Sequence, residues 1–589
     1  MTAYTSSQAG NWNTAATWGG GGFPIAGDTC EIRHAVDMTV AGSVGTSPGD
    51  STTFDCVING AFAAARLTIK AGITFTPKTN VKIAGDGFLV NRFIREAGSV
   101  VEFDVPGGVT YVCQYGSGVG EKAAGQSTGT FANPAYFRSK SGGGKVALTR
   151  VTGSGDQNDT YTEYRDVENA SHEMWASTPS QCITTATGCQ YVNCGTWMAD
   201  SGVEDGTIPT NRRFTSCSWS GTTGTRPLNA LWTGGATGDK YVQGCVFDKT
   251  PLFSGMEGMS ATLSGNVFLQ RYTATGSTTK SPNIQANFIR QIDENGIIAT
   301  GDVVGNYFLT DVDIFNPHWI ELCSTDSSKD STDNVFDHNG SFQSGDCHST
   351  GTGTAGTRTY NIKRNISLPS TLNGTSECGT MLTLLGNDKI SFVVEHNTCF
   401  QSHQGSVSIG ETYAGYVDIV TSCKSNITWC DQGVGDGTFK AWGQGYGMTN
   451  NALSAANADY NGGYNVTAGT KGNGYDITCD GSPGAHDVTG NPGFVDPRRN
   501  IKKWDQSLGG ANTVANAVAE LAKKNDFTGY NSAYSISALL TYVKAGFAPT
   551  SVLYHNTAHD GTDIGAVAWQ ASSSGGVLQM STLQRIGDD

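Results

Sequence analysis

The 589-residue sequence is poor in charged side chains, which make up 15% of it, against about 25% in an ordinary globular protein. It also lacks any uninterrupted apolar run of about 18 residues, the length at which a helix begins to span a bilayer. The low charge excludes coiled coils, long helical bundles and a charged disordered chain. Acidic residues outnumber basic ones, 52 to 37, for a net charge of −15. We therefore expect neither nucleic acid nor membrane insertion among its partners.

Several catalytic and ligand-binding motifs are missing as well. The sequence has no phosphate-binding GxxxxGK[ST] loop, no GxSxG elbow and no HExxH metal motif. Its 15 cysteines show no paired CxxC spacing, so we predict no metal site and no cofactor. An odd number of cysteines cannot pair completely within one chain, and most are expected to be small buried apolar residues.

What the sequence does have is glycine, at 78 positions, and a repeat. A polar residue followed by an apolar pair recurs at intervals of 19 to 32 residues. Repeats of this length are typical of solenoids, and short β-favouring runs broken by turn residues indicate the rungs of a parallel β-helix. The leading asparagines can stack and tolerate left-handed turns, with cysteine taking the same inward position. The leads are Cys194, Cys217, Cys245, Asn266, Asn287, Asn306, Asn334, Asn365, Asn397 and Asn426.

Two further sets of residues carry a family resemblance. The phrases at 491–497 (NPGFVDP) and 563–567 (DIGAV), and the opening series Trp12, Trp18, Pro24, Asp28 and His34, resemble the ends of right-handed parallel β-helix proteins of the pectate-lyase-like superfamily. The resemblance, with the repeat, implies an all-β fold: a right-handed, single-stranded parallel β-helix solenoid. We assign 1–60 to an N-terminal cap and first coils, 60–490 to the β-helix, and 491–589 to a small closing region.

The closing region is predicted to contain two short helices. Apolar residues recur at helical spacing in Thr513–Lys524 and Ser535–Ala545, and Gly546 and Pro549 follow the second segment. We expect both helices to dock on the C-terminal end of the solenoid.

Candidate catalytic residues lie where the sequence is rich in acid and histidine. Asp293, Asp311 and Asp313 fall five to seven places after their lead asparagines, which predicts one external column. Equivalent residues on adjacent rungs stand about 4.8 Å apart, close to the carboxylate separations that glycosidases use. We predict that Asp293 with Asp311 or Asp313 forms a general acid/base pair, with His338 as an auxiliary. The alternative is that these residues simply suit turns.

Aromatic residues in or beside the turns suggest a second function, since exposed aromatic faces stack on sugar rings. Trp319, Tyr413, Tyr416 and Trp429 are the candidate glycan-binding residues. The alternative is that they stack in the core.

Three classes of function remain. The first is a phage virion surface protein of tailspike, fibre or decoration type, which binds host-surface polysaccharide; whether it also depolymerises this polysaccharide stays open. The others are a secreted polysaccharide lyase or glycoside hydrolase, and a non-catalytic bacterial surface adhesin. The opening MTAYTSSQAGNW has neither the basic nor the apolar region of a secretion signal, and unpaired cysteines suit a reducing site of assembly. Both features favour the virion surface, after synthesis in host cytoplasm, over secretion. Other virion proteins and a homotrimer are the further expected partners. Spikes of this fold usually carry a separate N-terminal particle-binding domain, whereas here the tryptophan motif begins near Met1.

Overall fold

The computed structural model describes the chain in segments. These are residues 2–45, 54–59, 65–84, 90–115, 122–150, 157–168, 184–194, 197–199, 212–220, 228–229, 240–248, 262–272, 280–281, 283–291, 297–299, 301–311, 318–322, 329–338, 346–350, 358–368, 381–384, 390–400, 407–409, 420–429, 457–464, 485–527, 529 and 531–571.

Two long parallel sheets run along the molecule, and we call them sheet 1 and sheet 2. The strands of sheet 1 are β2 (Gly10–Asn11), β4 (Ala35–Met38), β7 (Arg66–Ile69), β10 (Val90–Glu96), β13 (Lys122–Thr128), β16 (Gln157–Thr160), β19 (Thr184–Thr187), β22 (Arg212–Thr215), β25 (Lys240–Gln243), β27 (Thr262–Ser264), β30 (Asn283–Gln285), β33 (Val303–Val304), β36 (Lys329–Thr332), β39 (Arg358–Lys363), β42 (Ile390–Glu395), β45 (Val420–Lys424) and β47 (Ala458–Asp459). The strands of sheet 2 are β5 (Gly42–Val44), β8 (Thr74–Pro77), β11 (Val100–Phe103), β14 (Ala135–Ser139), β17 (Thr162–Arg165), β20 (Gln190–Val192), β23 (Ser218–Ser220), β26 (Val246–Phe247), β28 (Val267–Tyr272), β31 (Phe288–Gln291), β34 (Tyr307–Thr310), β37 (Val335–His338), β40 (Ile366–Ser367), β43 (Thr398–Phe400), β46 (Ile427–Trp429), β48 (Gly462–Tyr464) and β49 (Val488–Thr489).

The third side of the coil is formed by three shorter parallel sheets in succession. The first contains β1 (Ala3–Thr5), β3 (Thr29–Ile32), β6 (Cys56–Asn59), β9 (Val81–Ala84), β12 (Thr110–Tyr115), β15 (Lys145–Arg150) and β18 (Val167–Glu168). The second pairs β21 (Trp197–Ala199) with β24 (Leu228–Asn229), and the third contains β29 (Lys280–Ser281), β32 (Ile297–Ala299), β35 (His318–Leu322), β38 (Asp346–Thr350), β41 (Leu382–Leu384) and β44 (Val407–Ile409).

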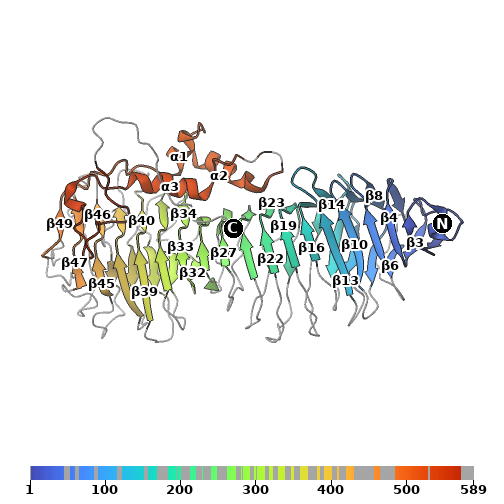
Figure 1. Ribbon diagram of the computed structural model, residues 1–589, viewed down its shortest axis with the longest axis horizontal. Coiled ribbons are helices and arrows are strands. Elements are labelled where there is room, and N and C mark those ends of the chain that lie inside the picture. The colour runs from blue at the N-terminus through green and yellow to red at the C-terminus, as the bar shows by residue number, and fades with distance from the viewer. Residues whose placement is uncertain are drawn as a thin grey trace.

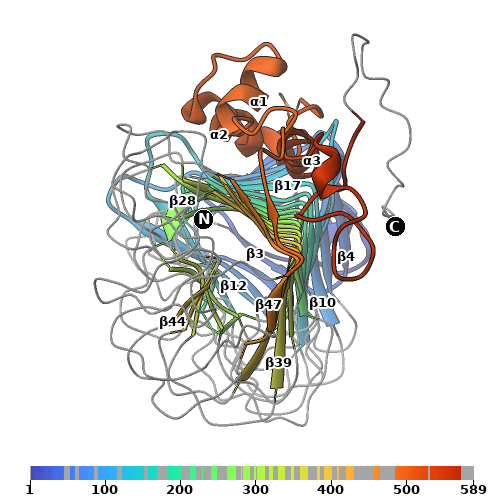
Figure 2. The same ribbon diagram turned by 90° about the vertical axis from the view of Figure 1, so that its left-hand side faces the viewer.

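The chain coils through these three sides in a fixed order, from the third side to sheet 1 and then to sheet 2. Successive coils stack along one axis, so the molecule is elongated in Figure 1 and three-sided when viewed along its length in Figure 2. The predicted all-β parallel solenoid is thus confirmed. Its right-handed sense and its N-terminal cap stay predictions. Within the described segments, no helix is both long and apolar enough to cross a membrane.

A ladder of buried asparagines connects the coils at the entrance to sheet 2. From Asn266 onward, the backbone N–H and the side-chain Nδ2 of each lead asparagine donate to Oδ1 of the next. The ladder continues through Asn426 to Asn461, whose backbone N–H donates to Asp487. The predicted amide stacking is therefore confirmed, and it satisfies polar groups that would be costly to bury unpaired.

The residue before each ladder position adopts the left-handed backbone conformation. Its φ lies between 52° and 65° at Gly188, Ser216, Gly244, Gly265, Ala286, Gly305, Asp333, Arg364, His396, Ser425 and Tyr460. The left-handed turn thus falls one residue before the asparagine that we expected to adopt it. The strand pairing also corrects one predicted lead residue. Strand β20 pairs with β23, with Gln190 opposite Ser218. Cys189, directly before Gln190, is therefore the equivalent of Cys217, and Cys194 is not. Cys217 and Cys245 hold the predicted inward position, and the backbone N–H of Cys217 donates to Cys245 Sγ.

Replacing a ladder asparagine should destabilise the protein strongly. Asn334 Nδ2 donates to Asn365 Oδ1 and to Val303 O, both at 2.9 Å, and its Oδ1 accepts two bonds from Asn306. Asn334→Ala would leave several buried groups without partners, which costs at least about 3 kcal/mol. Chemical denaturation measures this loss. Asn361→Ala is the matched control, because Asn361 Nδ2 makes an exposed bond to Asp330, and its loss should cost less than about 1 kcal/mol. Equal losses for both variants would contradict a stabilising ladder.

The C-terminal region lies along the flank of the solenoid. Its helices are α1 (Ile501–Ser507), α2 (Val514–Ala522) and α3 (Ile536–Gly546), and Thr513 and Ser535 cap α2 and α3. Figure 1 shows all three above sheet 2 rather than at the C-terminal end, where we expected them. The reason is that sheet 2 presents outward apolar side chains, including Phe288, Tyr307 and Val335, which pack with the helices in one cluster. The prediction missed α1 altogether.

Polar contacts fix this region over a long stretch of the solenoid. Asn525 Nδ2 donates to the carbonyls of Cys217 and Gly244, and Lys524 Nζ donates to that of Gly265. Farther along, Lys544 pairs with Asp333 at 3.2 Å. The region therefore binds the turns between sheets 1 and 2.

The solenoid interior also holds a few ionisable groups. Arg95 is fully buried and pairs with Asp159 at 2.7 Å, and both contact the hydroxyl of Tyr164. His348 is buried between Ser331 Oγ at 2.6 Å and the carbonyl of Met381 at 2.7 Å. Burial lowers the pKa of His348 to about 4, so it is neutral near pH 7.

This histidine should make the protein sensitive to mild acid. An unfolded histidine titrates near 6.5, so between about pH 6.5 and pH 4 the unfolded state binds the proton and the folded state does not. Stability should therefore fall with pH across this window, by up to about 3 kcal/mol from His348 alone. Urea unfolding at a series of pH values measures the slope. His348→Gln should flatten it, and an unchanged slope would contradict the assignment.

Candidate functional site

Most of the predicted site residues lie beyond what the structure describes. Asp293, Asp313, Tyr413 and Tyr416 fall outside the described residues. His338 ends β37 and Trp319 lies in β35, and only their backbone is described. The predicted acid/base pair and most of the predicted sugar-stacking residues thus stay predictions.

Asp311 is described, and its carboxylate is engaged with an arginine on the neighbouring coil. Arg290 donates from Nε to Oδ1 at 2.9 Å and from Nη2 to Oδ2 at 2.5 Å. Arg290 lies in β31, and Asp311 directly follows β34. Such a two-pronged pair is geometrically specific. Both oxygens of Asp311 therefore already have a partner, and a substrate would have to compete with Arg290 for them.

Trp429 does not present its ring for sugar stacking. It is only 2% exposed, and it packs edge-on against Phe494 and Phe547 from the C-terminal region. Trp429 points outward from sheet 2, as an exposed sugar-binding residue would, but the C-terminal region covers that face. The alternative of core packing holds for this residue.

The structure instead reveals a row of uncharged polar side chains on the outer face of sheet 1. These residues occupy equivalent positions on successive coils, and each is partly or fully exposed. Val304 interrupts the row once. We call the row the polar ladder, and its members are Thr187, Thr215, Gln243, Ser264, Gln285 and Thr332. It presents hydroxyl and amide groups about 4.8 Å apart.

Beyond Thr332 the same row becomes charged, with alternating signs. It continues through Lys363, Glu395, Lys424 and Asp459. Lys363 pairs with Glu395 at 2.8 Å. Burial alone would raise the pKa of Glu395, but hydrogen bonds from Lys363 and Ser422 outweigh it and hold this pKa below its usual value. The row therefore changes from neutral to zwitterionic along the molecule.

A second row on the same face carries carboxylates on adjacent coils. Asp302 and Asp330 occupy neighbouring positions, and the backbone N–H of Asp330 donates to Asp302 Oδ1 at 3.0 Å. Asn361 on the following coil donates to Asp330 Oδ1 at 2.7 Å. This is the adjacent-coil arrangement that the sequence predicted for Asp293 and Asp311, found on different residues.

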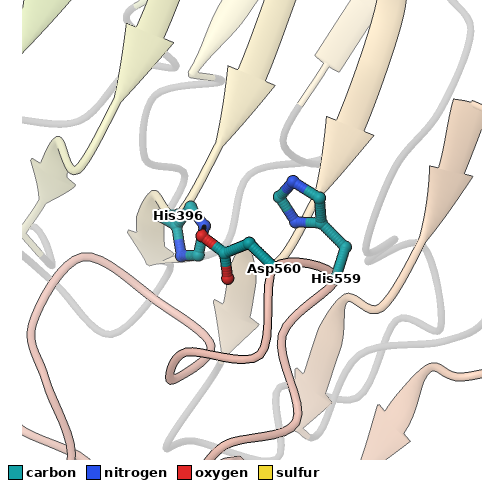
Figure 3. Close-up of side chains that lie close together, drawn as sticks. All are labelled: His396, His559 and Asp560. Atoms are coloured by element: carbon teal, nitrogen blue, oxygen red, sulfur yellow. Dashed lines mark ion pairs between the residues drawn. The ribbon is translucent and has the colours of Figure 1, made fainter.

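Two histidines and an aspartate meet where the C-terminal segment crosses the turns after sheet 1. His396 follows β42, whereas His559 and Asp560 come from the loop after the short 3₁₀ helix η4 (Val552–Tyr554). Their ligand atoms all lie within 4.8 Å of one another, and Figure 3 shows Asp560 between the two rings, with its carboxylate turned toward His396. Such a group has the composition of a metal site, which the sequence analysis did not predict.

The polar ladder could have been found from the sequence. Every member lies two residues before a ladder asparagine or its cysteine equivalent. We phased the repeats forward from the asparagines, toward the turns, and so overlooked the strand before them. The histidine group carries no such signal, since its members are far apart in the chain.

The fold and these surfaces define the molecule as a parallel β-solenoid with one polar face and one covered face. Comparison with known proteins found no matching family model, no matching curated protein and no matching solved structure.

Proposed function

We propose that this solenoid is a phage virion surface protein, of tailspike, fibre or decoration type, that binds host-surface polysaccharide along the polar ladder. The observation that carries this proposal is the row of neutral hydroxyl and amide groups on sheet 1, which runs from Thr187 to Thr332 with one interruption at Val304. A polysaccharide is itself a linear repeat of hydroxyl groups, so it can make the same contact many times. Neutral donors and acceptors suit sugar hydroxyls, and many weak contacts add up along one chain.

The rest of the molecule is compatible with this use of sheet 1. The α-helices pack over sheet 2, as Figure 2 shows, and the ladder residues keep partial or full exposure. A sheet on a rigid solenoid also holds its side chains at fixed spacing, which lowers the entropic cost of binding an extended ligand.

The cysteines support assembly in a reducing compartment such as host cytoplasm. Ten cysteines in the described segments are free and buried. Burial raises the pKa of Cys113, Cys194 and Cys399 to about 12, which keeps these thiols protonated and unreactive. Proteins of oxidising compartments tend to use cysteine in disulfides instead.

Shortening two side chains of the polar ladder should weaken polysaccharide binding. Gln243→Ala with Gln285→Ala removes two exposed amides, and each lost hydrogen bond costs about 0.5–1.5 kcal/mol. We expect affinity to fall by about tenfold, with little change in stability because both side chains are exposed. The measurement is binding to a panel of labelled bacterial capsules and lipopolysaccharides.

Gln114→Ala is the matched control, because Gln114 lies in β12 on the third side of the coil. It should bind as the unchanged protein does. Undiminished binding by the double variant would remove the ladder from the contact surface, and a panel without any bound glycan would contradict the proposed function.

Depolymerisation is a separate proposal, and it would also hold for a secreted lyase or glycoside hydrolase. We expect Asp293→Asn and Asp311→Asn each to abolish cleavage of the bound polysaccharide while leaving the fold intact. The release of reducing ends measures cleavage of the polysaccharide, and circular dichroism checks that the variants are folded. Asp311 is paired with Arg290, so Arg290→Gln tests whether the pair supports the fold or Asp311 acts in catalysis. If the pair supports the fold, this variant loses stability. If Asp311 is catalytic, this variant loses cleavage. Full activity in both aspartate variants would contradict the catalytic assignment.

A further inference from the structure

We propose that His396, His559 and Asp560 bind a divalent transition metal ion, Zn²⁺ by preference, which fastens the C-terminal segment to the solenoid. The proposal rests on the geometry of this group and is independent of glycan binding.

The separation of the groups is close to that of metal ligands. His396 Nε2 lies 3.2 Å from Asp560 Oδ2. Two ligands of a tetrahedral zinc ion with bonds of about 2.0–2.1 Å stand about 3.3 Å apart. His559 Nε2 lies 3.4 Å from Glu395 Oε1, which places a second carboxylate beside the group. The ligand atoms of His396, His559 and Asp560 lie within 4.8 Å of one another. Small side-chain movements would therefore bring all three to bonding distance of one ion.

Both imidazole rings are held by their other nitrogen. Nδ1 of His396 lies 3.2 Å from the carbonyl of Asp563, which can only accept, so Nδ1 carries the proton. Nδ1 of His559 lies 2.8 Å from Ser425 Oγ, and in the tautomer with its proton on Nδ1 this nitrogen donates to that hydroxyl oxygen. Metal-binding histidines typically donate from their distal nitrogen to such partners, which leaves the other nitrogen for the metal.

This arrangement leaves a lone pair facing a carboxylate. In a neutral His396 whose proton is on Nδ1, Nε2 points its lone pair at the Asp560 oxygen only 3.2 Å away. Two electron-rich atoms at that distance need a proton or a cation between them. A divalent ion bound by both atoms meets this requirement.

The ligand set indicates which ion would bind. Two imidazole nitrogens and one carboxylate oxygen suit Zn²⁺, whereas Ca²⁺ and Mg²⁺ prefer oxygen ligands alone. Asp560 Oδ1 accepts from Thr562, so Oδ2 is the oxygen directed at the site. The ligands come from two segments distant in the chain, which makes the ion a cross-link between them.

The test is zinc titration of the untagged full chain by calorimetry. We expect one Zn²⁺ per chain with Kd at or below about 1 μM, and a weakening of at least tenfold in His396→Ala and in His559→Ala. Zinc should raise the thermal unfolding midpoint of the unchanged protein but not of these variants, since a ligand that binds only the folded state stabilises it. Zinc should also slow hydrogen exchange at residues 555–571.

The matched control is His486→Ala. His486 lies at the same end of the molecule, where it stacks on Tyr460 and pairs with Asp459, and its loss should leave zinc binding unchanged. If the unchanged protein binds no zinc at micromolar concentration, or if His486→Ala weakens binding as much as His396→Ala, the proposal is overturned. The first outcome does not depend on the folding of the ligand variants, and circular dichroism of His396→Ala checks the folding on which the second depends.

Discussion

Stacking of coils in strict register is the constraint on which the rest of this structure depends. From Gly188 onward, each described coil turns from sheet 1 into sheet 2 through one left-handed residue, and the next residue points its side chain inward. An asparagine there bonds to the same residue on the next coil, so any slip in register would break buried amide bonds on both sides. Because the register is fixed, every other position also lines up into rows. The polar ladder is therefore a consequence of the asparagine ladder two residues away.

The same register gives the molecule its different faces. Inward rows are apolar and aromatic, as in the stack of Tyr191, Trp219 and Phe247. Outward rows differ between sheets: the row of the polar ladder on sheet 1 is mostly polar, whereas on sheet 2 from Val246 onward the outward residues are apolar and packed against α1 to α3. One solenoid thus combines an exposed polar surface with a surface built for its own C-terminal region.

The sequence predicted the fold well because the fold depends on local repetition. The recurring asparagines revealed the coil, and apolar residues at helical spacing located α2 and α3, which the structure shows to be capped by Thr513 and Ser535. The position of the helices over sheet 2 was not predicted. Strands such as β31 carry apolar residues on both faces, and a sequence does not show which element covers the outer face. The site was harder for a related reason. His396 and His559 meet only because the C-terminal segment folds back, so no spacing motif predicts their contact.

The path of that C-terminal region has a consequence for how the chain folds during synthesis. Residues such as Val267, Phe288 and Ile366 in sheet 2 are buried by side chains that follow residue 500. A ribosome makes the solenoid from its N-terminal end, so these coils emerge well before the segment that covers them. Until that segment is made, the apolar outer face of these coils is exposed to solvent, and such a surface favours association between chains. The segment that closes this surface is therefore synthesised after it.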